Sequence, residues 1–198
     1  DTYYVDHAGD VVNEAAGGGS DRVLAAVSYA IAAASEVETI EAADPAATTA
    51  IDLTGGNGAN TLKGNAGRNV LNGRAGADAM YGYAGDDTYH VDDAGDGVFE
   101  AADGGNDTVI ADASYALGAG QSVETLRTRG SATTYAVDLA GNDVANTLVG
   151  NAAANLLDGK GGADVLRGYG GADIFAFTTA LGAGNVDLIV DFAPGVDR

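Results

Sequence analysis

The chain has 198 residues, of which 31 are glycine and none is cysteine, and its 29 acidic and 9 basic residues give a formal net charge of -20. This length accommodates one or two domains, and this charge opposes binding to nucleic acid phosphates or to an anionic membrane. The lack of cysteine excludes disulfides, thiolate zinc sites and a thiol nucleophile, and no apolar run reaches the length of about 18 residues that a transmembrane helix needs.

Aspartate greatly outnumbers glutamate, with 23 residues against 6. Aspartate next to glycine is typical of tight turns. A carboxylate on a short side chain is also a good ligand for a hard cation. The composition therefore predicts a turn-rich chain whose acidic residues do more than make a soluble surface.

The chain repeats itself with a period of 86 residues. The segment DTYYVDHAGDVVNEAAGGGSDRV from Asp1 matches DTYHVDDAGDGVFEAADGGNDTV from Asp87, and about half of all aligned positions are identical. A third copy opens with DIFAF at Asp173. We expect the chain to be part of a longer tandem array. The predicted segments are a first module over residues 1–86, a second over 87–172 and a truncated third copy over 173–198.

A period of nine residues lies inside each copy. Residues 55–90 read GGNGANTLK, GNAGRNVLN, GRAGADAMY and GYAGDDTYH, and residues 141–176 read GNDVANTLV, GNAAANLLD, GKGGADVLR and GYGGADIFA. Position one is always glycine and position eight is always a large apolar residue. Position six is occupied by Asn60, Asn69, Asp78, Asp87, Asn146, Asn155, Asp164 and Asp173. The repeat therefore has the pattern GGxGxDxUx, in which U is a large apolar residue.

Each nonapeptide is too short for a helix but long enough for a tight turn and a short strand. Glycine permits the positive φ angles and close backbone approach that such a turn requires. One apolar side chain in nine residues cannot form a core alone, so the units must stack on one another. Stacking places the position-six carboxylates in a column, where a cation such as Ca²⁺ turns their repulsion into ligation.

The nonapeptides resemble those of the repeats-in-toxin (RTX) family, whose glycine-rich repeat binds Ca²⁺. The resemblance implies an all-β fold, a right-handed parallel β-roll, in which two nonapeptides form one coil and several Ca²⁺ ions lie between stacked turns. The ending DIFAF…VDLIVDFAPGVDR is also similar to the segment that follows the roll in serralysin-type secreted proteases.

The resemblance also implies which atoms hold each ion. In the family, the earlier of two stacked turns contributes the carbonyls of positions two and four, and the later turn contributes those of positions one and three. Both turns add their position-six side chains, which pairs Asn60 with Asp78, Asn69 with Asp87, Asn146 with Asp164 and Asn155 with Asp173. The implied carbonyl ligands are those of Gly56, Gly58, Asn65, Gly67, Gly73, Arg74, Ala75, Gly76, Gly82, Tyr83, Ala84, Gly85, Asn142, Val144, Asn151, Ala153, Gly159, Gly161, Gly168 and Gly170.

The repeat phase continues past the obvious motif, although not without interruption. Three further pairs follow from it: Asp78 with Asp96, Asp87 with Asp107, and Asp1 with Asp21. These pairs offer an ion two negative charges, whereas an Asn/Asp pair offers one, so we expect the sites that contain Asn to be weaker. A step of two nonapeptides from Asp164 reaches Gly182, and the roll is expected to break up there.

The segments between the arrays contain β-rich runs, TVIADASYAL, VETLRTRG and TTYAVDL, separated by glycine-rich turns. We expect them to form strands that lengthen or flank the roll. The best helix candidate covers residues 25–40, but its second copy contains GAGQS, which argues against a helix.

These features predict a module that binds calcium and folds when calcium binds, with no catalytic activity of its own. The two histidines, His7 and His90, do not align between the copies, and no HExxH motif is present. The RTX resemblance implies export by a type I secretion system and an extracellular or cell-surface location. The expected partners are calcium, the secretion machinery and neighbouring copies of the module.

Two other functions stay open from the sequence. The chain could be a unit of a repetitive structural or adhesive surface array, which the regular 86-residue period favours. It could also be a polysaccharide-binding module, with Tyr83 and Tyr169, at position two of their repeats, stacking on sugars instead of packing on a neighbouring turn. A hydrolase activity could belong only to other parts of a parent protein.

Overall fold

The computed structural model describes residues 1–15, 17–180, 182 and 184–198. These residues form short β-strands joined by turns, and no helix occurs among them. The described part of the chain accordingly has no helix with the length and hydrophobicity needed to cross a membrane. The chain divides into two units, Asp1–Asp107 and Thr108–Arg198.

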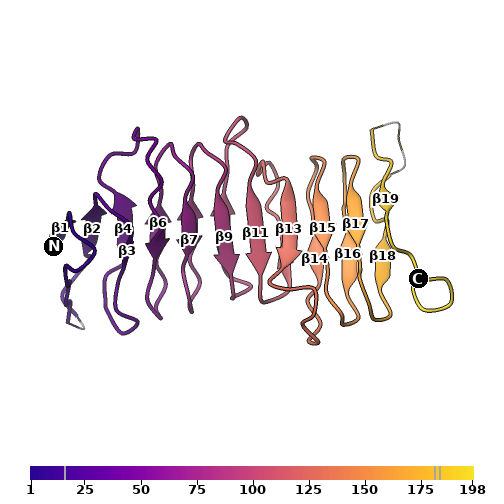
Figure 1. Cartoon of the computed structure of the whole chain (residues 1–198), viewed down its shortest axis with the longest axis horizontal. Coiled ribbons are helices and arrows are strands. Elements are labelled where there is room, and N and C mark those ends of the chain that lie inside the picture. Colours follow the sequence, from indigo (N-terminus) through magenta and orange to yellow (C-terminus); the bar gives the residue numbers. More distant parts are fainter. Residues whose placement is uncertain (16, 181, 183) are drawn as a thin grey trace. The chain divides into compact units, whose positions relative to one another are not determined.

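The first unit consists of two parallel sheets, and from β2 onward the chain passes alternately from one to the other (Figure 1). Neighbouring strands in each sheet pair in parallel. One sheet contains β1 (Thr2–Val5), β2 (Arg22–Ala25), β4 (Thr39–Ala42), β6 (Thr61–Lys63), β8 (Ala79–Tyr81) and β10 (Gly97–Phe99). The other contains β3 (Tyr29–Ala30), β5 (Leu53–Thr54), β7 (Val70–Asn72) and β9 (Thr88–Val91).

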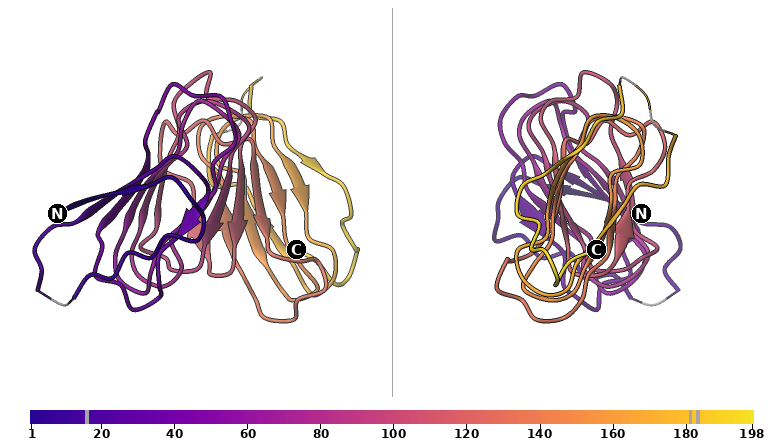
Figure 2. Two further views of the ribbon diagram at one scale, coloured as in Figure 1. Left: turned by 60° about the vertical axis from the view of Figure 1, so that its left-hand side comes forward. Right: turned by 90° about the vertical axis from the view of Figure 1, so that its right-hand side faces the viewer.

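The second unit has the same construction. One series of parallel strands is β11 (Thr108–Ala111), β13 (Thr125–Thr128), β15 (Thr147–Val149), β17 (Val165–Arg167) and β19 (Leu188–Ile189). The other is β12 (Tyr115–Ala116), β14 (Leu139–Ala140), β16 (Leu156–Asp158) and β18 (Ile174–Ala176). Figure 2 shows the strands lying side by side within each unit, with the turns at their ends. This is the predicted all-β parallel β-roll.

The core of each unit is a thin layer of stacked position-eight side chains. In the first unit Ile40, Leu62 and Met80 lie in register on β4, β6 and β8 and are fully buried. On the other sheet Leu53 and Leu71 are in register with Tyr89 and equally buried. The second unit repeats this arrangement with Leu126, Leu148 and Leu166, and with Leu139, Leu157 and Phe175. The predicted role of position eight is therefore confirmed.

The segments between the arrays form further coils of the roll. TVIADASYAL contains β11 and β12, VETLRTRG contains β13, and TTYAVDL runs into β14. Residues 25–40 contain the end of β2, the whole of β3 and the start of β4, so the helix candidate forms strands and turns. A parallel ladder fixes only the residues that pair, so coils of unequal length can stack while their extra residues lie in the turns.

The expectation that the roll breaks up at Gly182 is wrong. β19 pairs in parallel with β17, so another strand is added to the sheet beyond the second array. Gly182 lies in the connection before it, in an antiparallel bridge with Asn185. The nine-residue phase ends there, but the sheet continues because a longer connection returns the chain to its edge.

The strand pattern repeats with the 86-residue period of the sequence. The first residues of β1, β4 and β6 are Thr2, Thr39 and Thr61, and their counterparts in β9, β13 and β15 are Thr88, Thr125 and Thr147. The two units meet at Asp107 and Thr108 and not at a repeat boundary. The module boundaries therefore describe the sequence period, and they stay a prediction.

Candidate metal centre

The position-six residues form a ladder of hydrogen bonds along the turns, here called the position-six ladder. In six of the seven predicted pairs, the backbone N–H of the earlier residue donates to Oδ1 of the later residue, and in Asp1–Asp21 the donor is the terminal amino group of Asp1. The N···Oδ1 distances are 2.7 Å for Asn60–Asp78, Asn69–Asp87 and Asn146–Asp164, 2.8 Å for Asp87–Asp107, 2.9 Å for Asn155–Asp173 and Asp78–Asp96, and 2.5 Å for Asp1–Asp21. The two residues of each predicted pair are thus in direct contact, through the backbone nitrogen of the earlier residue and the side chain of the later one, and their pairing as metal ligands stays a prediction.

The ladder extends to residues that the sequence pattern did not identify. Asp187 and Asp197 accept the N–H groups of Asp164 and Asp173, each at 3.0 Å. Asp187 follows Asp164 by 23 residues, and Asp197 follows Asp173 by 24. The nonapeptide repeat predicts a separation of 18, as between Asn60 and Asp78, and therefore does not identify these two residues. Glu38 also joins the ladder, because its Oε2 accepts the N–H of Asp21 at 2.7 Å.

Asparagine at position six has protein hydrogen-bond partners for both polar atoms of its side chain. Asn60 Oδ1 accepts the N–H of Gly56 in its own turn at 2.7 Å, and Nδ2 donates to the carbonyl of Val37 in the preceding coil at 2.7 Å. The other three asparagines make the same two bonds. Asn69 bonds to Asn65 N and Ile51 O. Asn146 bonds to Asn142 N and Val123 O, and Asn155 bonds to Asn151 N and Val137 O. Both polar atoms of each amide are thus satisfied by the protein.

In three of the four RTX turns with aspartate at position six, one carboxylate oxygen has no protein partner among the described residues. Asp78, Asp87 and Asp164 are at most 2% exposed, and each uses Oδ1 in the ladder. Their Oδ2 atoms are buried and have no hydrogen-bond partner within the described part of the chain. A buried carboxylate oxygen without a partner is costly unless a cation ligates it, and carboxylate oxygens are the ligands that Ca²⁺ prefers. These turns therefore fit a hard cation.

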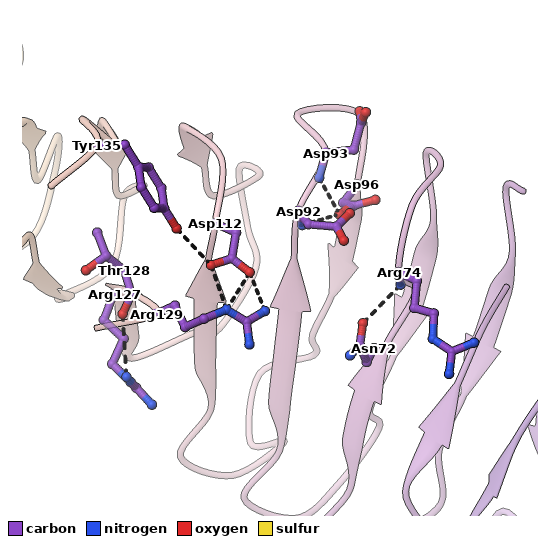
Figure 3. A network of polar contacts seen from close by, with 10 residues as sticks. All are labelled: Asn72, Arg74, Asp92, Asp93, Asp96, Asp112, Arg127, Thr128, Arg129 and Tyr135. Carbon is purple, nitrogen blue, oxygen red and sulfur yellow. Dashed lines mark hydrogen bonds and ion pairs between the residues drawn. The ribbon is translucent and has the colours of Figure 1, made fainter. Parts of the chain in front are cut away.

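Asp96 behaves differently from Asp78, Asp87 and Asp164. Its Oδ2 accepts the N–H groups of Asp92 and Asp93 at 3.1 and 3.2 Å, so both carboxylate oxygens have protein donors (Figure 3). In the pair Asp78–Asp96, the oxygen that is open to an ion therefore belongs to Asp78.

The backbone of the turns also differs with the residue at position six. In the aspartate turns, position two has a positive φ, for example 62° at Arg74 and 65° at Lys160. The N–H of Arg74 is held there by Asn72 Oδ1 at 3.0 Å (Figure 3). Among the described residues, none of the asparagine turns has a positive φ at position two. Turns with asparagine and turns with aspartate at position six therefore differ in backbone conformation. The sequence predicted only a difference in charge between them.

A family model described as the RTX calcium-binding nonapeptide repeat, in four copies, matches residues 54–89 and 140–175. These two stretches are RTX repeats. They contain both kinds of turn described above and imply that the chain binds Ca²⁺. No curated protein and no solved structure matches the chain.

Two predicted carbonyl ligands of the RTX turns are also hydrogen-bond acceptors within the roll. The carbonyl of Asn142 accepts the N–H of Gly161 at 2.9 Å, and that of Asn151 accepts the N–H of Gly170 at 3.3 Å. Tyr83 and Tyr169, at position two of their RTX turns, are 43% and 48% exposed. The Arg167 guanidinium lies 5.4 Å from the centroid of the Tyr169 ring. The carbonyl assignments stay a prediction, as does the role of the two tyrosines.

Burial makes the RTX carboxylates weaker acids in the metal-free protein. It raises the pKa of Asp87 from 3.8 to about 7, with a further increase from the charge of Asp107 and a partial decrease from the Asn69 N–H bond. Burial likewise raises the pKa of Asp78 and of Asp164 to about 6. Without a cation, the ionised carboxylates thus oppose folding at neutral pH.

The metal-free chain is expected to gain β structure when the pH is lowered. These groups have a higher pKa folded than unfolded, so their destabilising effect is complete above a pH of about 7 and disappears as the pH falls toward about 4. Far-UV circular dichroism of dialysed protein, taken down to just above its pI of about 4.1, measures this gain. A metal-free spectrum that does not change with pH contradicts the prediction.

Proposed function

We propose that the chain is a calcium-dependent folding module in which Ca²⁺ ions in the aspartate RTX turns hold successive coils together. The observation that carries this proposal is the set of buried Oδ2 atoms of Asp78, Asp87 and Asp164, which lack a partner among the described residues. The ions would be held by these side chains and by the carbonyls of the same stacked turns. Calcium supplies the positive charge that the buried column lacks.

The energy that calcium can supply is large enough to decide whether the chain folds. An ion that binds only the folded state stabilises it by RT ln(1 + [L]/Kd). With about 2 mM Ca²⁺ and a Kd of about 0.1 mM, each site contributes about 1.8 kcal/mol. Several such sites together are comparable with the 5–15 kcal/mol stability of a typical domain. At the sub-micromolar calcium level of a cytosol the contribution is close to zero.

A calorimetric titration of the whole chain with Ca²⁺ and with Mg²⁺ tests the proposal. We expect several Ca²⁺ ions to bind with millimolar or tighter affinity, and Mg²⁺ to bind much more weakly. Mg²⁺ demands near-octahedral geometry and gives up its water reluctantly, whereas Ca²⁺ accepts the irregular set of carbonyls and carboxylates in such turns. Equal affinities for the two ions, or no binding of calcium, would contradict the proposal.

The dependence of folding on calcium is compatible with export of the chain from the cell before it folds. A chain that stays unfolded at low calcium and folds at the higher calcium level outside the cell suits passage through a narrow conduit. We therefore propose type I secretion and an extracellular or cell-surface location, with the described residues as a binding module and any catalytic activity elsewhere in a parent protein.

A tandem surface array is the second candidate function. The observation in its favour is the repetition of strand bounds after 86 residues, because equal modules can stack into a long regular body. The number of modules in the full-length sequence separates the two candidates. Many copies favour an array, and a few copies next to another domain favour an accessory folding module.

A further inference from the structure

A glutamate lies beside the position-six ladder at the start of the second sequence copy. Asp87, Glu100 and Asp107 can each present one carboxylate oxygen so that all three lie within 4.8 Å of one another. All three residues are buried, at 1%, 5% and 0% exposure. Glu100 comes from the segment between β10 and β11, outside the nonapeptide motif. The hydroxyl of Tyr89 donates a hydrogen bond to its Oε1.

The orphaned oxygen of Asp87 points into this group of carboxylates. Its Oδ2 is buried without a hydrogen-bond partner among the described residues. A side chain at position 82 would collide with Asp87 Oδ2, Glu100 Oε1 and the Tyr89 hydroxyl, so these three oxygens converge on the bare Cα of Gly82. The second oxygen of the Glu100 carboxylate, Oε2, lies next to Gly104, where a side chain would also collide with it. The site is therefore built around two glycines that leave room for the glutamate.

The first sequence copy has a similar but more exposed group, in which Asp1 is exposed, Glu14 is half-buried and Asp21 is buried. Asp1, Glu14 and Asp21 also place carboxylate oxygens within 4.8 Å of one another, and the hydroxyl of Tyr3 donates to Glu14. Glu14 is the counterpart of Glu100 one 86-residue period earlier, and the two are among only 6 glutamates in the chain. The Oδ2 of Asp21 is again buried and lacks a partner among the described residues.

The three buried carboxylates of Asp87, Glu100 and Asp107 lie too close together for all to stay ionised without a compensating charge. Protons or a cation can supply that charge. Protonation does not explain why several oxygens converge on one place, or why such a group occurs in both copies. A hard cation uses all the oxygens as ligands, and the adjacent backbone can add carbonyls, since the Tyr83 and Ala101 carbonyls also lie next to Gly104.

We propose that Glu100 is a third carboxylate ligand for a Ca²⁺ ion held by Asp87 and Asp107, and that Glu14 has the same role beside Asp1 and Asp21. Each copy then begins with a three-carboxylate calcium site. This site binds Ca²⁺ more tightly than the other RTX turns, because affinity for Ca²⁺ rises with the number of charged ligands. The inference rests on the proposed calcium function and adds an affinity-determining residue to it.

Glu100→Gln tests this role in the full chain, because glutamine keeps the shape of the side chain and an oxygen that can accept the Tyr89 hydrogen bond. The control is Glu36→Gln, which removes the same charge at an exposed position. Binding is followed by tyrosine-sensitised luminescence of Tb³⁺, to which Tyr89 is a close donor, and by competition with Ca²⁺. We expect Glu100→Gln to weaken the tightest calcium-binding step about tenfold or more, and Glu36→Gln to leave it unchanged.

The outcomes separate this inference from the calcium function itself. If the parent chain binds Ca²⁺ and Glu100→Gln has the same binding curve, the glutamate is not a ligand, while the calcium function stands. If the parent chain binds no Ca²⁺, the proposed function fails. Should Glu100→Gln not fold at saturating Ca²⁺, Glu14→Gln at the half-buried site of the first copy replaces it. A weakened tight step in that variant supports the inference, and an unchanged one overturns it.

Discussion

Removal of calcium from the full chain is expected to abolish its β-sheet circular dichroism, and millimolar Ca²⁺ is expected to restore it in one cooperative transition. The net charge of -20 opposes compaction. The thin core leaves each coil dependent on its neighbours, because one apolar side chain per turn buries little surface. Without cations, the buried carboxylates of Asp78, Asp87 and Asp164 add a further cost. Folding and calcium binding should therefore occur together.

The control for this experiment is Mg²⁺ or a monovalent salt at the same ionic strength. Screening alone weakens repulsion between exposed charges but does not ligate a buried oxygen. Calcium should therefore restore the spectrum at concentrations where the other salts do not. A chelated sample that keeps its β spectrum at neutral pH would show that the roll folds without ions.

Much of the fold follows from the nonapeptide because each position has one physical task. Position eight supplies the core, as the full burial of Leu62 and Leu71 shows, and glycine at position one leaves room for the position-six side chain of its own turn. The β-rich runs between the arrays were also predictable, because stacking needs strands but not strands of constant spacing. A fixed spacing was the wrong assumption at Gly182, where a longer connection precedes β19.

The candidate site was less predictable than the fold. The sequence gives the identity of a position-six residue, but not whether its second polar atom finds a partner in a neighbouring coil. That depends on which backbone groups face the turn, as Val37 O does for Asn60 Nδ2. Glu100 was missed for another reason, since it lies outside the motif. Its signal was present in the sequence, because Glu14 occupies the same position of the first copy.

Aspartate and asparagine at position six are expected to respond differently to mutation, because Asp78, Asp87 and Asp164 leave a buried oxygen for an ion whereas the asparagines have protein partners. The free energy of unfolding, plotted against the logarithm of the Ca²⁺ concentration, has a slope set by the number of ions released on unfolding. Asp78→Asn keeps an oxygen that can accept the N–H of Asn60 but removes the charge that would hold the ion. This variant should lose about one ion from the slope.

Asn60→Ala should instead keep the slope and shift the whole line to lower stability. The substitution leaves the Gly56 N–H and the Val37 carbonyl without the partners that Asn60 provides, which costs about 1–3 kcal/mol for each group that water cannot reach. Urea unfolding at several calcium concentrations gives both quantities. Asp164→Asn and Asn146→Ala repeat the comparison one 86-residue period later, where the same bonds are present.

Equal losses of slope in the aspartate and asparagine variants would mean that asparagine turns also bind calcium. If only the aspartate variants lose slope, the ions bind in the turns where a carboxylate oxygen has no protein partner.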